Sequence, residues 1–200
     1  AAFEPAGTGS IAAEIRVRGL KGGHSGLEID QGRGNAIKLL TRALLRLERL
    51  GARIAAISGG NKHNAIPREA EALVVLPKKN LQQAKDLIVQ IETVLKAEIA
   101  TVDPGLIVVL EPLPGKRAKV LRKAQQRKIL QTLTSLPHGV IKMSAEIPGL
   151  VETSTNLAVV KTEKKQVSVV TSQRSSVASE IDEIAEMVQT VFRLGGAAGK

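Results

Sequence analysis

The apolar side chains of this chain recur with two different periods, and this alternation limits its fold more than any other feature. From Ile11 to Leu20 apolar and polar residues alternate, as in a strand with one buried face. From about Gly34 to Leu50 the apolar residues instead follow a helical stripe, which Gly51 ends. A chain that switches between these periods is expected to pack helices against a sheet.

The same two patterns continue to the end of the chain. Further strands are predicted at Arg53–Ser58, Ala70–Leu76, Leu106–Leu110, Leu157–Thr162 and Val167–Thr171, the last two as a hairpin. Further helices are predicted from the N-cap Asn80 to about Asp103, over Lys119–Leu136 with Leu121, Ala124, Leu130 and Leu133 facing inward, and around Ile181–Phe192.

The order of these elements predicts the fold class. Each half offers strands with two helices, in the approximate order strand, helix, strand, strand, helix, strand, although no residue-level repeat relates the halves. We expect an α+β protein of two ferredoxin-like βαββαβ halves, with sheets covered on one face by helices. The halves would be residues 1–103 and 104–200, with the seam near Asp103–Gly105.

Composition limits the core and the cellular setting. Hydrophobic residues make up 43% of the 200 residues, yet only Phe3 and Phe192 are aromatic, so the core must be aliphatic. The lack of cysteine excludes disulfides and thiolate sites, and it fits a cytoplasmic protein. No apolar run approaches the roughly 20 residues of a membrane helix, and residues 1–10 lack the features of a signal peptide. We therefore expect a soluble protein without a membrane partner.

The net charge of +10 raises the question of nucleic acid. Much of the excess lies in a basic cluster of seven side chains: Lys116, Arg117, Lys119, Arg122, Lys123, Arg127 and Lys128. Proteins that bind single-stranded nucleic acid also need aromatic side chains on which the bases stack, and this chain has almost none. A solvated helix face, or a surface that meets an acidic domain, is the preferred interpretation. A basic ferredoxin-like module that binds RNA or an acidic protein is the alternative.

A glycine-rich loop at residues 20–26 is the first segment that is unusual for an ordinary connection. Three glycines within five residues, in Gly-Gly-His-Ser-Gly, let the backbone hold His24 against something that approaches closely. The structural alternative is a turn in which the imidazole caps a carbonyl. The spacing matches neither of the two common glycine-rich phosphate-binding motifs.

Two further segments share this ambiguity. Residues 59–69 include Asn64, and their glycine and asparagine residues before Pro67 are typical of a turn. Residues 171–176 join a strand end to a helix start, and Arg174 there could bind a carboxylate through two hydrogen bonds or be solvated. By themselves, these residue types do not decide whether the segments bind a ligand or only connect two secondary-structure elements.

In this order, the segments resemble a known family. The motifs of this chain that carry the resemblance are Gly-Gly-His-Ser-Gly (22–26), Gly-Gly-Asn (59–61), Asn-Ala-Ile-Pro-Arg-Glu (64–69), Pro-Gly-Leu-Val-Glu-Thr-Ser (148–154) with Asn156, and Arg-Ser-Ser (174–176). They are similar to the lid, a dimerisation-type domain, of bacterial aminoacyl-histidine dipeptidases. These are two-zinc exopeptidases related to carnosinase and carboxypeptidase G. The likeness runs from about residue 10 to residue 196.

The resemblance implies a role for each candidate residue. His24 matches the lid histidine that would hydrogen-bond the scissile carbonyl oxygen and stabilise the oxyanion. Asn64 matches an asparagine implied in substrate recognition, and Arg174 the arginine that would pair with the terminal carboxylate of the substrate. If the second half mimics the dimer partner of smaller lids, His24 and Arg174 could serve one pocket.

The metal-binding part of such an enzyme is missing from this sequence. The His-x-Asp and Glu-Glu motifs expected for the two zinc ions of the catalytic domain are absent, so we expect no metal ligand here. The ends, residues 1–9 and 195–200, look like trimmed linkers, and we expect a lid separated from its catalytic domain and inactive by itself. Its partners would be a dipeptide substrate, held together with that domain, and a second copy in a homodimer.

Overall fold

The computed structural model of the protein describes residues 2–198 and is built on one antiparallel seven-stranded sheet. Six strands follow the order β11-β10-β4-β6-β2-β7, and β9 pairs with β10. Their bounds are β2 (Ser10–Arg18), β4 (Arg53–Gly59), β6 (Ala70–Pro77), β7 (Ile107–Leu113), β9 (Gly139–Met143), β10 (Val151–Thr162) and β11 (Val167–Ser175).

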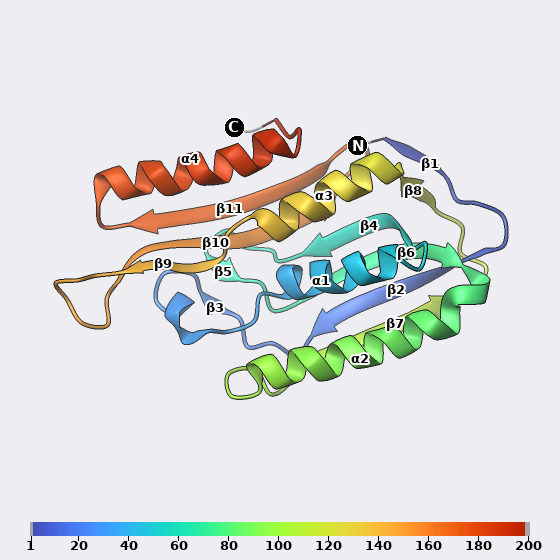
Figure 1. Ribbon diagram of the computed structural model, residues 1–200, viewed down its shortest axis with the longest axis horizontal. Helices are drawn as coiled ribbons and strands as arrows, with labels where there is room; N and C mark the ends of the chain where they lie inside the picture. The colour runs from blue at the N-terminus through green and yellow to red at the C-terminus, as the bar shows by residue number, and fades with distance from the viewer. Residues whose placement is uncertain (1, 199–200) are drawn as a thin grey trace.

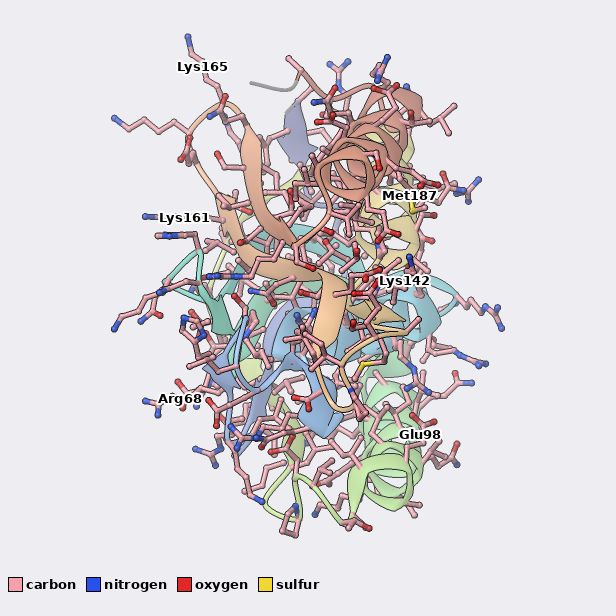
Figure 2. All side chains as sticks on the ribbon, turned by 90° about the vertical axis from the view of Figure 1, so that its left-hand side faces the viewer. Arg68, Glu98, Lys142, Lys161, Lys165 and Met187 are labelled. Carbon is pink, nitrogen blue, oxygen red and sulfur yellow. The ribbon has the colours of Figure 1, made fainter. Side chains whose placement is uncertain are left out.

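The α-helices cover one face of this sheet, as Figures 1 and 2 show. They are α1 (Ala36–Glu48), α2 (Leu81–Ile99), α3 (Lys123–Ser135) and α4 (Ala178–Leu194). Neighbouring helices touch in the order α2, α1, α3, α4, with α2 over β7 and α4 over β11. Between the layers lies a core of Leu, Ile, Val and Ala side chains, which confirms the predicted aliphatic core and the α+β class. No helix within residues 2–198 is long and apolar enough to cross a membrane.

Most of the predicted elements are confirmed, because their periodicity reports real burial. The alternating residues Ile15 and Val17 face the helices on β2, and the stripe that includes Ile37 and Leu40 faces the sheet on α1. Asn80 stands at the N-cap of α2, but its side chain donates a hydrogen bond to the Leu50 carbonyl instead of capping the helix.

The predicted helix over Lys119–Leu136 is wrong at its start. Residues Lys119–Leu121 form strand β8, which pairs with β1 (Phe3–Pro5), so the stretch expected to be a linker is also a strand. Val120 packs into a small cluster on the outer face of the sheet, while Leu121 enters the main core. Adjacent side chains on opposite faces are typical of a strand, and α3 begins only at Lys123. Ala124, expected inward, is exposed.

The sheet is continuous across the expected seam, so two separate ferredoxin-like sheets are not shown. Strand β7 follows the seam in sequence, yet it pairs with β2 of the first half. In the second half, β8 pairs with β1 in a ribbon of its own beside the sheet. At the seam itself, the buried carboxylate of Asp103 accepts hydrogen bonds from the backbone nitrogens of Lys21 and Gly34, 2.7 Å each. Asp103 therefore ties together both ends of the loop that contains His24.

Candidate substrate-binding site

A two-stranded ribbon beside the main sheet carries His24. Its strands are β3 (Gly23–His24) and β5 (Ala65–Ile66), with His24 opposite Ala65. The backbone nitrogen of Ser25 donates to the carbonyl of Asn64 at 3.0 Å, so the two predicted site segments lie side by side. The side-chain nitrogen of Asn156 on β10 donates to the Ala65 carbonyl at 2.8 Å and fixes the ribbon to the sheet.

The imidazole of His24 is held by its own turn. Its Nδ1 atom accepts hydrogen bonds from the backbone nitrogens of Gly26 and Leu27, 3.2 Å each. A ring nitrogen that accepts carries no proton, so the neutral imidazole has its proton on Nε2. The turn predicted as the structural alternative is therefore present, but the ring accepts from two N–H groups and does not cap a carbonyl. Its remaining nitrogen, Nε2, is a donor.

A cleft of about 850 Å³ adjoins this ribbon, and both His24 and Asn64 line it. Its other walls come from the ends of β2, β4 and β6, on the side of the sheet away from the helices. Figure 2 shows Arg68 projecting from this side, opposite the helical layer. The charged side chains of the lining are mainly cationic, with Arg16, Arg18, Lys21, Lys62 and Arg68 against Glu69 and Glu71.

Only one of these five cations is neutralised by an ion pair within residues 2–198. Arg16 lies 2.5 Å from Glu14 and 2.9 Å from Glu111, and the hydrogen bond with Glu14 raises the pKa of the Arg16 guanidinium. The other four, Arg18, Lys21, Lys62 and Arg68, form no ion pair within residues 2–198. The cleft is therefore suited to an anionic group.

Arg174 approaches the same turn from β11, where it lies opposite Ser154. Its guanidinium lies against Gly26: a methyl group on Gly26 would stand 3.1 Å from Arg174 Cζ. Arg174 is exposed and is not among the residues that line the cleft. The turn of residues 24–27 thus lies between two predicted site residues, Asn64 on one chain segment and Arg174 on another.

Sequence reasoning missed two polar residues next to His24. Glu28 and Arg33 contact the backbone on both sides of Gly23, although their loop has no periodicity to mark them. Two buried side-chain oxygens near the ribbon, Ser25 Oγ and Asn156 Oδ1, have no hydrogen-bond partner within residues 2–198.

The described residues do not fit a metal centre. In residues 2–198 no group of three His, Asp or Glu side chains is placed to hold an ion. His63 is exposed, and His138 lies with Nδ1 3.3 Å from the Asn35 amide nitrogen. Burial and the nearby Lys38 ammonium lower the pKa of His138 to about 4. The seven side chains of the basic cluster at residues 116–128 are all exposed in this chain.

Comparison with known proteins places this geometry in a family. A family model described as a peptidase dimerisation domain matches residues 15–103, which include His24 and Asn64 but not Arg174. The cytosol non-specific dipeptidase of Escherichia coli K12 is 35% identical over 185 residues, covering 92% of this chain and 38% of that protein. This chain belongs to the family of peptidase dimerisation domains.

Nearly the whole of this chain superimposes on part of the crystal structure of aminoacylhistidine dipeptidase from Vibrio alginolyticus. The TM-score is 0.95 with 36% identity, over 98% of this chain and 40% of that one. The predicted resemblance to the aminoacyl-histidine dipeptidase branch is confirmed. The chain spans about two fifths of the length of both relatives.

Proposed function

We propose that this chain is the substrate-binding and transition-state-stabilising lid of a zinc-dependent dipeptidase acting on Xaa-His dipeptides. Support comes from the two relatives named as dipeptidases and from the placement of His24, Asn64 and Arg174 around one turn. The observation that carries the proposal is the hydrogen bonding of the His24 ring, since it leaves Nε2–H as a fixed donor.

His24 would act by hydrogen bonding to an oxygen that becomes negative. As the scissile carbonyl turns tetrahedral, its oxygen gains charge, and the Nε2–H group of His24 would donate to it. The two N–H groups on Nδ1 hold the ring in the donor tautomer before the reaction, so little reorganisation is needed. Loss of one such donor typically lowers kcat by about 10²–10³.

Asn64 and Arg174 would hold the substrate. Asn64 lines the cleft with His24, and its side-chain amide can both donate and accept hydrogen bonds. The guanidinium of Arg174 can bind a carboxylate with two parallel hydrogen bonds, which suits the free C-terminus of a dipeptide. The cationic lining of the cleft favours the same anionic class.

The bond-breaking chemistry would come from a domain outside these residues. In the proposed parent enzyme that domain holds two zinc ions, and none of the described residues of this chain fits a metal centre. The chain alone is therefore proposed to be inactive. We further propose that the parent is homodimeric, which the family description supports and sedimentation of the purified protein would test. A cytoplasmic location is proposed from the name of the Escherichia coli relative.

The test is a chimera in which this chain replaces the matching segment of the Escherichia coli dipeptidase. We expect hydrolysis of Xaa-His dipeptides by the chimera with zinc, and a fall in kcat of about 10²–10³ in His24→Ala with a small change in KM. His63→Ala is the matched control, because His63 is an exposed histidine on the same connection as Asn64. Equal activity of both variants would contradict the role of His24.

A further inference from the structure

The carboxylate of Glu28 holds the backbone of His24 directly. Its Oε2 atom accepts a hydrogen bond from the His24 backbone nitrogen at 2.7 Å. The backbone nitrogen of Glu28 in turn donates to the His24 carbonyl at 3.0 Å. Glu28 therefore contacts His24 through both its side chain and its main chain, which closes the turn over residues 24–28.

Arg33 holds the other side of the same strand. Its Nη1 group donates to the carbonyl of Gly22, and its Nη2 group lies 2.9 Å from Glu28 Oε1 and 2.6 Å from Gln31 Oε1. Only 18% of the Arg33 side chain and 32% of the Glu28 side chain are exposed. The ion pair is thus partly shielded from solvent, and it connects the two backbone contacts.

Gly23 lies between these contacts and leaves no room for a side chain. A Cβ atom there would stand 2.6 Å from Arg33 Nη1 and 2.8 Å from Glu28 Oε2. Its φ of +152° is also a conformation that favours glycine. The glycine directly before His24 is therefore explained by the ion pair that packs on it.

From this geometry we infer that Glu28 and Arg33 are positioning residues that clamp the backbone of Gly22–His24 and so fix the direction of the His24 ring. The clamp acts together with Asn156, which holds the opposite strand of the ribbon through Ala65. The inference rests on the proposed function only for its effect on catalysis. Its structural part, control of the His24 ring by Glu28 and Arg33, concerns this chain alone.

The clamp is expected to persist at neutral pH. The hydrogen bond from the His24 backbone nitrogen, assisted by Arg33, lowers the pKa of the Glu28 carboxyl. The Glu28 side chain is therefore ionised over the neutral range, and its contacts would weaken only as the pH falls through that lowered pKa.

The first measurement is heteronuclear NMR of the imidazole nitrogens in the 200-residue chain. In the parent chain we expect the signature of a single tautomer with the proton on Nε2. Glu28→Ala and Arg33→Ala should give a mixture of tautomers, while Glu28→Gln, which keeps an oxygen acceptor, should be intermediate. Asp30→Ala is the matched control, because Asp30 is an exposed carboxylate in the same loop with no ion pair within residues 2–198. Dispersed backbone spectra would establish that each variant is folded.

The second measurement is kinetic, in the chimera with the Escherichia coli dipeptidase. Glu28→Ala should lower kcat by about tenfold to a hundredfold with little change in KM, because misdirection of the donor affects the transition state more than binding. Unchanged ring signals in folded Glu28→Ala and Arg33→Ala would overturn the inference, whatever the role of His24. Altered ring signals in a chimera whose kcat is indifferent to His24→Ala would support the clamp and refute the proposed function.

Discussion

The guanidinium of Arg174 lies so close to the backbone of Gly26 that a methyl group there would stand 3.1 Å from the Arg174 Cζ atom. The two residues come from opposite halves of the chain, and Gly26 also donates its backbone N–H to the His24 ring. This contact brings Arg174 to the turn that holds the His24 ring, although Arg174 does not line the cleft that His24 lines. That the two residues serve one pocket stays a prediction. The contact also makes the position of Arg174 sensitive to the turn.

Replacement of Arg174 tests its binding role. In the chimera, Arg174→Lys should raise KM for dipeptides about tenfold, because an ammonium keeps the charge but loses the second parallel hydrogen bond. The fall in kcat should be smaller. Arg127→Lys, an exposed arginine on α3, is the control and should leave KM unchanged. A dipeptide KM that is the same in both variants would contradict a carboxylate contact.

A methyl group at Gly26 should disturb binding without unfolding the protein. The φ of Gly26 is not positive, so the backbone accepts alanine, but the Arg174 guanidinium must shift by a few tenths of an ångström. We expect Gly26→Ala to change the free energy of unfolding by less than about 1 kcal/mol and to raise KM several-fold. Gly7→Ala, where nothing lies within 4 Å, is the control. Loss of stability comparable to a core mutation would show that the turn itself, and not Arg174, is strained.

Gly60 should tolerate no side chain. Its φ is +66°, and a Cβ atom would stand 1.9 Å from the Ala158 carbonyl oxygen on β10. Gly60→Ala should lower the free energy of unfolding by about 3 kcal/mol or more, since backbone strain and overlap add. Gly9→Ala has a similar φ of +72° but open space, so it isolates the conformational part. Denaturant titrations giving equal losses for the two variants would exclude the close approach of Ala158.

Loss of the Asp103 carboxylate should destabilise the loop that contains His24. Asp103→Ala leaves the buried backbone N–H group of Gly34 and the partly buried one of Lys21 without their acceptor, which should cost about 2–4 kcal/mol of unfolding free energy. Hydrogen exchange should rise first at residues 21–34. The control is Asp182→Ala on the exposed side of α4. A loss of unfolding free energy no greater than that of the control would contradict the role of Asp103 in holding this loop.

His138 should make stability fall at mildly acidic pH. Its pKa is lowered to about 4 in the folded state from an ordinary 6.5, so the unfolded state binds more protons between these values. The stability contribution of the neutral ring is therefore complete above about pH 6.5 and is lost as the pH falls toward 4, by about 1–3 kcal/mol. Thermal midpoints measured across this window should decline more steeply for the parent chain than for His138→Gln. Parallel pH profiles would refute the lowered pKa.

The amino-acid sequence predicts the elements whose burial is periodic and the residues that lie in the family motifs. Alternation along β2 and the stripe on α1 predict a strand and a helix, because each face of such an element meets one environment. His24, Asn64 and Arg174 were found through motifs, since their loops have no periodicity of their own. The helix predicted from Lys119 failed, because Val120 and Leu121 serve two different cores.

Features that depend on partners distant in the chain become visible only in the folded protein. The continuity of the sheet rests on pairing between β10 and β4, and the location of β7 rests on pairing with β2, neither of which leaves a local signal. The approach of Arg174 to Gly26 and the clamp of Glu28 and Arg33 are likewise contacts between polar loop residues. Polar side chains in loops follow no hydrophobic period, so only the folded backbone brings their charges and hydrogen-bonding atoms together.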